Sequence, residues 1–175
     1  MTKQELTARI KEEAYLEGEF ILRSGKKSNY YMDKYRFEAC PDILKALGEE
    51  FAKHITDDVT LIAGPELGGV ALAASASMVS GKKWVIVRNS KKGYGTGNVV
   101  EGGKITSDDV VLLVEDIATT GGQVIEAAKV IVEAGAKVKK IVAVIDRKQG
   151  AKENINEAGF EFASIVTKED LGITD

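Results

Sequence analysis

The stretch from Val110 to Gln123 limits the possible folds of this chain more than any other segment. It opens with five apolar residues in a row, three of them β-branched, which is typical of a buried strand in a parallel sheet. Two carboxylates, Glu115 and Asp116, come next, and a Thr- and Gly-rich turn then leads into a helix that should end near Gly135. Ligands of open α/β sheets bind beyond the carboxyl ends of the strands, so we expect a ligand site at this turn.

The composition of the turn favours an anion as the ligand. Thr119, Thr120, Gly121 and Gly122 offer two hydroxyls, backbone N–H groups and the positive end of a helix dipole, a combination best suited to a phosphate. The two preceding acids would repel a phosphate, so we expect them to bind the hydroxyl groups of a sugar. At this point an ordinary strand–turn–helix with a glycine-rich corner remains the alternative.

The order of apolar run, two acids and T-T-G-G turn resembles the phosphoribosyl-pyrophosphate (PRPP) motif of type I phosphoribosyltransferases. The version from Glu115 to Gly122 is most similar to that of the orotate phosphoribosyltransferases. The resemblance implies that Glu115 and Asp116 hold the ribose hydroxyls, and that residues 118–122 anchor the 5'-phosphate with Thr119 also near the base. The substrate-binding residues implied here are Ile117, Ala118, Thr119, Thr120, Gly121, Gly122 and Gln123.

Composition excludes several other classes of protein. The 175 residues suit one domain, and a net charge of -3 gives no reason to expect nucleic acid or an anionic membrane as partner. No apolar run approaches the roughly 18 residues that span a bilayer, and no signal sequence is recognisable, so we expect no membrane association and a cytoplasmic location. The single cysteine, Cys40, is predicted to be a packing residue, and the single histidine, His54, a surface residue on a helix.

Residues 1–40 are predicted to form a helix and a small hood. A capping box at Thr2 begins a helix that should run to about Leu16, and a short strand should follow at residues 20–22. The S-G-K-x-S-x-Y-Y pattern from Ser24 to Tyr31 taken alone favours a solvated hairpin. It also resembles the hood of orotate phosphoribosyltransferases, which implies that Lys26 contacts the pyrophosphate end of PRPP. The same resemblance implies that the backbone near Tyr30 and Tyr31 covers the orotate ring. Purine phosphoribosyltransferases lack this hood.

A second strand–glycine turn–helix unit lies between Thr60 and Ser80, with its helix expected over residues 70–80. Its turn resembles the pyrophosphate loop of the family. Many bacterial members carry a lysine in this loop where the present chain has Gly68, so backbone amides should make more of the contact. The residues implied to bind substrate in this loop are Gly64, Pro65, Glu66, Leu67, Gly68 and Gly69.

A third strand at residues 84–87 leads into the glycine-rich segment from Arg88 to Asn98, which is predicted to be a mobile loop or an exposed hairpin tip. It resembles the catalytic loop of the family, R-x-x-x-K-x-H-G, with Arg88 and Lys92 at the basic positions and Lys91 as an additional cation. Tyr94 stands where many relatives have histidine. Because a Tyr hydroxyl can bind a phosphate oxygen without becoming a cation, no essential histidine is expected. The glycines match neither G-x-G-x-x-G nor a P-loop.

A fourth strand, residues 141–145, ends in Asp146 and Arg147. An arginine at this edge can clamp a carboxylate through two parallel hydrogen bonds, and the resemblance implies that Arg147 binds orotate. A surface salt bridge between Arg147 and Asp146 is the alternative. A short helix over residues 151–158 and an edge strand over 160–166 should complete the chain. The helix after the central turn should carry an apolar stripe of Val124, Ala128, Ile131 and Val132.

The sequence therefore predicts a doubly wound α/β fold, with a mostly parallel five-stranded sheet, helices on both faces and a small N-terminal hood. Residues 1–175 should form a single domain, with the helix and hood at 1–40 and the core at 41–175. The resemblance implies transfer of phosphoribose from PRPP to orotate with Mg²⁺ held mainly by PRPP, a homodimer with shared active sites, and the decarboxylase of the next step as a candidate partner. Another phosphoribosyltransferase, acting on a purine or other base, and a PRPP-binding regulator stay open as alternatives.

Overall fold

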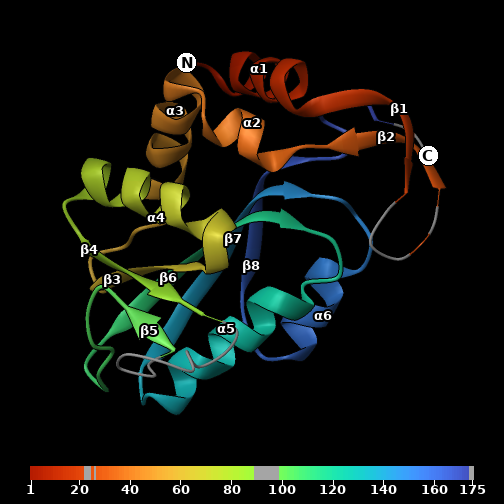
Figure 1. The fold of residues 1–175 in the computed structure, drawn as a ribbon. Helices are drawn as coiled ribbons and strands as arrows, with labels where there is room; N and C mark the ends of the chain where they lie inside the picture. Colours follow the sequence, from red (N-terminus) through yellow and green to blue (C-terminus); the bar gives the residue numbers. More distant parts are fainter. Residues whose placement is uncertain (22–24, 26, 89–98, 174–175) are drawn as a thin grey trace.

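The computed structural model describes residues 1–21, 25, 27–88 and 99–173, and a six-stranded sheet lies at its centre (Figure 1). The strand order is β5-β4-β3-β6-β7-β8, and all neighbours are parallel except β4 and β5. The five parallel strands are those predicted from the sequence, and the doubly wound fold class is confirmed. The two-residue strand β5 is an addition. The strands are β3 (Leu61–Pro65), β4 (Lys83–Val87), β5 (Val100–Glu101), β6 (Val110–Ala118), β7 (Lys137–Asp146) and β8 (Phe162–Thr167).

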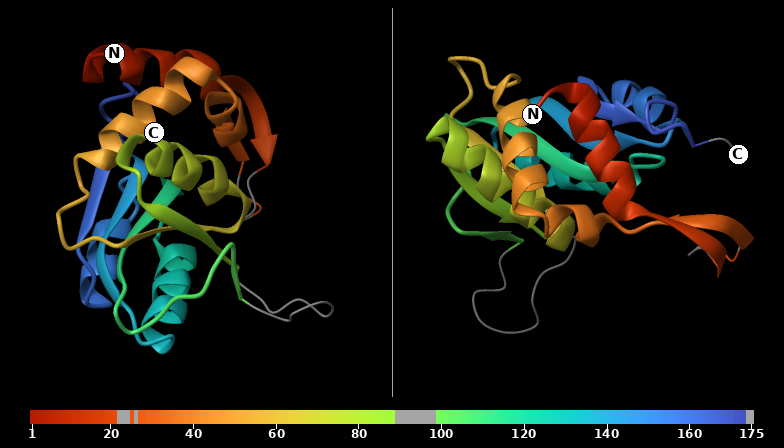
Figure 2. Two further views of the ribbon diagram at one scale, coloured as in Figure 1. Left: turned by 90° about the vertical axis from the view of Figure 1, so that its left-hand side faces the viewer. Right: turned by 90° about the horizontal axis from the view of Figure 1, so that it is seen from above.

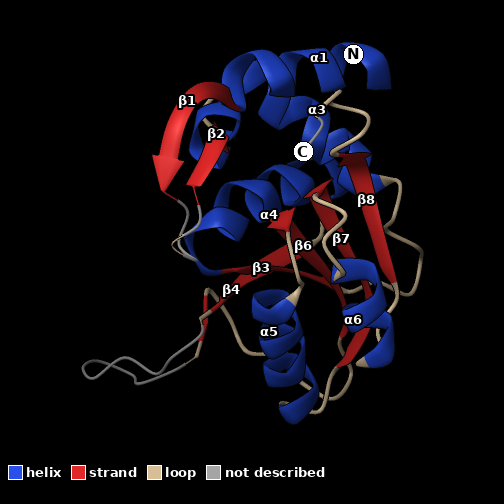
Figure 3. Cartoon of the chain, turned by 90° about the vertical axis from the view of Figure 1, so that its right-hand side faces the viewer, coloured by secondary structure: helices blue, strands red, loops and turns tan. Residues whose placement is uncertain are grey.

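Helices cover both faces of this sheet (Figures 1 and 3). One layer consists of α1 (Lys3–Ala14), α2 (Lys34–Glu38), α3 (Pro41–Ala52) and α4 (Glu66–Ser80), and the other of α5 (Gly122–Glu133) and α6 (Ala151–Glu157). Strand β6 contributes to both cores because its side chains alternate. Leu112 and Val114 pack toward the first layer, whereas Val111 and Leu113 pack toward α5 and α6, and all four are fully buried.

The predicted hood is an antiparallel hairpin formed by β1 (Tyr15–Ile21) and β2 (Lys27–Met32). Figure 2 shows this hairpin extending beyond the helical layer. The first helix ends at Ala14, two residues earlier than expected, because Tyr15 already pairs with Met32 across the hairpin. The capping box predicted at Thr2 is present, with the Glu5 N–H donating to the Thr2 hydroxyl at 3.2 Å.

Three further local expectations were wrong. Helix α4 begins at Glu66 rather than Val70, so four of the six residues of the predicted loop Gly64–Gly69 form the first turn of the helix. Val132 is half-exposed, because it lies about 100° around α5 from Ile131, and Ala127 completes the buried stripe instead. His54 lies in the turn after α3 and is partly buried, which lowers its imidazole pKa. Cys40 precedes α3 and packs against the core as expected.

The order of the strands places a topological switch point beside β3. The chain leaves β3 through α4 to reach β4 on one side, and it later returns to β6 on the other side. The turns that follow β3 and β6 therefore lie next to each other at the carboxyl edge of the sheet, where ligands of such sheets bind. Among the helices of the described residues, none has the length and apolarity to cross a membrane.

Candidate active site

The turn after β6 joins the central strand to the first turn of α5. Gly121 precedes the helix with a φ of +79°, a left-handed conformation that favours glycine. A β-carbon at this position would lie 2.9 Å from Ile155 Cγ1 of α6. The side-chain amide of Asn154 donates to the Thr120 carbonyl at 2.9 Å, so α6 holds the turn from outside. Asn154 belongs to no sequence motif, and its contact with Thr120 arises only in the tertiary structure.

This turn surrounds a small polar pocket of about 90 Å³. The N-terminus of α5 and the Thr119 and Thr120 hydroxyls lie around it, which gives the chemistry expected of a phosphate site. Its walls include all seven residues that the resemblance assigned to this turn: Ile117, Ala118, Thr119, Thr120, Gly121, Gly122 and Gln123. Glu115 also lines it.

The two acids lie inside β6 rather than after it, because the strand continues to Ala118. Both side chains are buried. Asp116 accepts hydrogen bonds from the Ile117 N–H at one oxygen and from Lys34 Nζ, 2.6 Å away, at the other. Burial, reinforced by the charge of Asp116, raises the pKa of Glu115 well above its ordinary value. The pair therefore combines an ion-paired carboxylate with a carboxyl group whose pKa is raised.

Glu38 of α2 is a third buried acid near this pair. Burial and then the charge of Asp116 raise its pKa to about 8, against the opposing effect of Lys34. Its Oε1 has no hydrogen-bond partner within the described residues. Neither Glu38 nor Lys34 was identified from the sequence, because α2 carries no motif and its approach to β6 arises only in the tertiary structure.

The segment Gly64–Gly69, which comprises the end of β3 and the first turn of α4 and is called the β3–α4 loop below, packs tightly against the acids. A β-carbon at Gly64 would overlap the Gly69 carbonyl, so these two glycines allow the ends of the loop to meet. Glu66 has a φ of +50°, which is unusual for a residue with a side chain. Pro65, Glu66 and Gly68 share a second small pocket with Glu115, Asp116 and Gln123. Leu67 of the same loop points to solvent and is 68% exposed. The structure thus brings the two predicted turns together.

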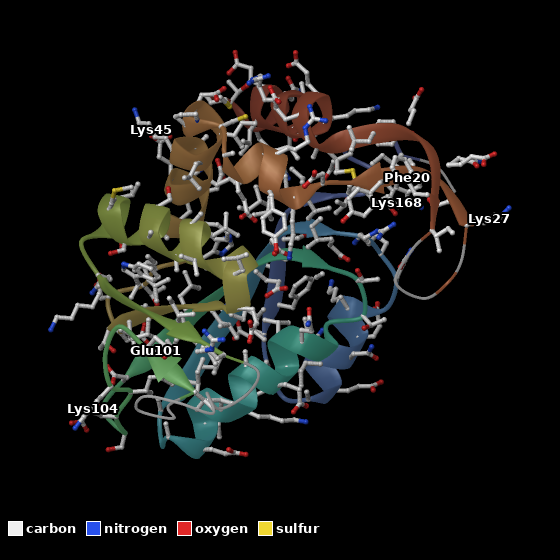
Figure 4. All side chains as sticks on the ribbon, viewed as in Figure 1. Phe20, Lys27, Lys45, Glu101, Lys104 and Lys168 are labelled. Carbon is white, nitrogen blue, oxygen red and sulfur yellow. The ribbon has the colours of Figure 1, made fainter. Side chains whose placement is uncertain are left out.

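Arg147 follows β7 at the same edge and reaches the hood. Its guanidinium donates to the Tyr30 hydroxyl at 3.1 Å and lies 5.7 Å from the centre of that ring. Asp146 is paired instead with Lys148, whose Nζ is 3.5 Å away, so the predicted alternative of an Arg147–Asp146 salt bridge is not what forms. Tyr31 pairs with Leu16 in the hairpin and is half-exposed, and its ring lies 5.6 Å from the ring of Phe20, which Figure 4 labels.

Four predicted site residues, Lys26, Lys91, Lys92 and Tyr94, lie outside the described residues. Arg88 is described directly after β4, and its backbone N–H donates to the Val99 carbonyl at 2.7 Å. Within the described ranges, no group of three or more His, Cys, Asp or Glu side chains is arranged to hold a metal ion. A broader pocket of about 740 Å³ lies between α1 and residues 170–172 and contains none of the predicted site residues.

Three comparisons with known proteins agree. The family model described as phosphoribosyl transferase domain matches residues 36–168. The orotate phosphoribosyltransferase of Methanocaldococcus jannaschii is 46% identical over 157 residues, covering 90% of this chain and 89% of that protein. A crystal structure of Mycobacterium tuberculosis orotate phosphoribosyltransferase with Fe(III) dicitrate superimposes with a TM-score of 0.88 at 28% identity, covering 98% and 99% of the two chains. The same enzyme in complex with PRPP gives a TM-score of 0.84 at 26% identity and the same coverage.

Proposed function

The chain belongs to the phosphoribosyl transferase domain family and, within it, to the orotate phosphoribosyltransferases, and from this premise we propose the roles of its residues. It is a pentosyltransferase of pyrimidine biosynthesis. The reaction transfers the 5-phosphoribosyl group of PRPP to orotate and gives orotidine 5'-monophosphate and pyrophosphate. One observation supports the assignment of roles most strongly: the phosphate-type turn after β6, the acid pair and the β3–α4 loop adjoin one another.

In the proposed binding mode, PRPP lies across the two small pockets. The 5'-phosphate binds to residues 118–122, and the ribose hydroxyls donate to Glu115 and Asp116. The pyrophosphate then extends toward Gly64–Gly69. Supporting this direction, Glu115 lines both pockets, whereas Asp116 lines only the one that the β3–α4 loop shares.

The chemistry requires no protein nucleophile. Breaking the anomeric C–O bond places positive charge on the ribose and negative charge on the departing pyrophosphate. The carboxylate of Asp116 is suited to stabilise the ribose cation, and Lys26, Arg88 and Lys92 are assigned to the pyrophosphate, with Lys91 and Tyr94 contributing contacts. Closure of the Arg88–Asn98 segment over the site would exclude water and so prevent hydrolysis of PRPP.

The family is generally dependent on Mg²⁺ through PRPP. The described residues fit a metal carried by the substrate, since Asp116 is already ion-paired with Lys34 and these residues include no group of three or more His, Cys, Asp or Glu side chains arranged to hold a metal ion. We therefore propose that the oxygens of PRPP hold the ion, with Glu115 and Asp116 nearby. When bound, Mg²⁺ would neutralise charge on the leaving pyrophosphate.

The choice of base is assigned to Arg147 and the hood. A guanidinium clamps a carboxylate with two parallel hydrogen bonds, and orotate, unlike uracil or the purines, carries a carboxylate. Tyr30 positions the guanidinium through its hydroxyl and ring. Tyr30 and the backbone beside it, including that of Tyr31, would then cover the base. Purines carry no carboxylate, so a purine-specific enzyme would gain no such contact from Arg147.

We further propose a homodimer whose catalytic loops reach into the partner's site. In support, α4 presents an apolar stripe with helical spacing, namely Leu67, Ala71, Ala74 and Met78, in which Leu67 is 68% and Met78 79% exposed. Sharing is tested by mixing inactive Lys92→Ala and Asp116→Asn subunits. Restored activity in proven heterodimers supports shared sites, and its complete absence contradicts them. The decarboxylase that consumes the product is a candidate partner, and the cytoplasm is the proposed location.

The direct test of the reaction follows the absorbance of orotate in the presence of PRPP and Mg²⁺. We expect loss of orotate absorbance that depends on both additions, and no reaction with uracil, adenine or guanine. Turnover of a purine instead of orotate would favour the other phosphoribosyltransferases. A chain that binds PRPP without turning over any base would favour a PRPP-binding regulator, and DNA binding would then be measured.

A further inference from the structure

Lys34, the first residue of α2, reaches into the acid pair from the hood side of the molecule. Its Nζ lies 2.6 Å from Asp116 Oδ2, although the two residues are 82 positions apart in the sequence. The Lys34 side chain is 32% exposed, whereas that of Asp116 is 5% exposed. One end of the ion pair is therefore fixed in the sheet, while the lysine side chain at the other end is partly accessible to an incoming ligand.

The absence of a side chain at Gly68 makes this approach possible. A β-carbon there would overlap Asp116 Oδ2 and would lie 2.9 Å from Lys34 Nζ. Any other residue at position 68 would therefore displace the ion pair. The ammonium lies directly beside the backbone of the β3–α4 loop, the segment to which we assigned the pyrophosphate.

The charges around this point favour a role for Lys34 in binding an anion. The segment from Gly64 to Gly69 contains no cationic residue, and it includes the acid Glu66. Among the described residues that line the pocket between this loop and the acid pair, Lys34 is the only cation. Desolvation lowers the pKa of Lys34, but the hydrogen bond and charge of Asp116 outweigh this and raise it, so the side chain stays an ammonium.

We propose that Lys34 binds the pyrophosphate of PRPP, an inference that rests on the function proposed above. The ribose hydroxyls compete for Asp116 in the bound state, and the ammonium, which has three N–H donors, turns one of them to a pyrophosphate oxygen above Gly68. Because that oxygen gains negative charge as the C–O bond breaks, the contact strengthens toward the transition state. Lys34 thereby supplies the positive charge that the β3–α4 loop lacks.

The test compares two ligands that differ only in the pyrophosphate. Calorimetry with PRPP and with ribose 5-phosphate, in Mg²⁺, is performed on the wild type, on Lys34→Met and on the control Lys45→Met. Lys45 is 78% exposed and lies 4.0 Å from Glu49. We expect Lys34→Met to weaken PRPP binding about 10-fold or more, the scale of one charged hydrogen bond, with little change for ribose 5-phosphate. Lys45→Met should change neither affinity.

Each other outcome has a distinct meaning. Equal PRPP binding by the wild type and Lys34→Met overturns the inference and leaves the proposed function intact. Equal weakening of both ligands also overturns it, since Lys34 would then act only by holding Asp116. A wild type that binds neither ligand contradicts the proposed function itself. If thermal unfolding shows that Lys34→Met does not fold, Lys34→Gln provides the same comparison, because it keeps a donor for Asp116 without the charge.

Discussion

Arg147 donates a hydrogen bond to the hydroxyl of Tyr30 at 3.1 Å, across 117 residues of sequence. This contact joins the carboxyl edge of the main sheet to the two-stranded hood. The hood and the main sheet are separate sheets. The contact places the cation assigned to the orotate carboxylate against the aromatic ring assigned to the orotate base. In the proposed function, selection of the base therefore depends on two parts of the fold that this hydrogen bond joins.

Arg147→Ala should weaken orotate binding about 10- to 100-fold, the scale of hydrogen bonds to a charged group, and leave PRPP affinity nearly unchanged. Lys148→Ala is the matched control, because this neighbouring cation pairs with Asp146 instead. Separate KM values for the two substrates provide the measurement. A similar loss for both substrates would show that Arg147 is not the base clamp.

Asp116→Asn should lower kcat about 10²-fold or more, as expected for the loss of one electrostatic catalytic group. The exposed Asp108→Asn serves as the control for the same change of charge. Steady-state assays of orotate consumption measure the effect. Near-normal turnover of the Asp116 variant would remove the assigned role at the ribose.

Gly121→Ala should destabilise the protein more than Gly81→Ala. Both glycines have left-handed φ values, +79° and +72°, but only at Gly121 would the new methyl group meet a neighbour, Ile155. We expect an additional loss of about 1–3 kcal/mol from this overlap, measured by chemical denaturation. Equal losses in the two variants would mean that α6 does not restrain the turn.

Glu38→Gln should stabilise the protein increasingly as the pH rises. The folded-state pKa of Glu38 is raised to about 8. In the wild type, the stabilising contribution of this group to folding is therefore fully present below about pH 4.5 and is lost as the pH rises toward 8. The difference in unfolding free energy between variant and wild type should therefore grow between about pH 5 and about pH 9. A difference independent of pH would contradict the raised pKa.

Met78→Glu should convert a homodimer to monomers, because it places a charge in the apolar stripe of α4. Lys82→Glu, at a position beyond the end of α4, is the control for added negative charge. Sedimentation at micromolar concentration separates the two states. A wild type that sediments as a monomer, or a Met78 variant that stays dimeric, would exclude this face as the interface.

The sequence predicted the parts of this fold in which local pattern and burial agree. Val110–Val114 had to be a buried strand, and the turn at Thr119–Gly122 had to face the carboxyl edge of the sheet, where the structure places it. The capping box at Thr2 similarly identified the first helix. In each case the residues within a few positions of one another determine the local structure.

What the sequence did not predict depends on contacts between distant residues. Lys34 and Glu38 approach the acid pair only because α2 packs beside α4 and β6, and Asn154 reaches Thr120 only through the packing of α6. The start of α4 at Glu66 was missed because Pro and Gly in Gly64–Gly69 favour a loop, whereas the structure accommodates Glu66 at a positive φ and continues the helix from there.

Calorimetric titration of the wild type with PRPP in the presence of Mg²⁺ tests the central claim most directly, namely that the acid pair and the two adjoining turns bind this one ligand. We predict saturable binding of one PRPP per chain, sharply reduced by Asp116→Asn. A correctly folded protein that takes up no PRPP at millimolar concentration would contradict the account.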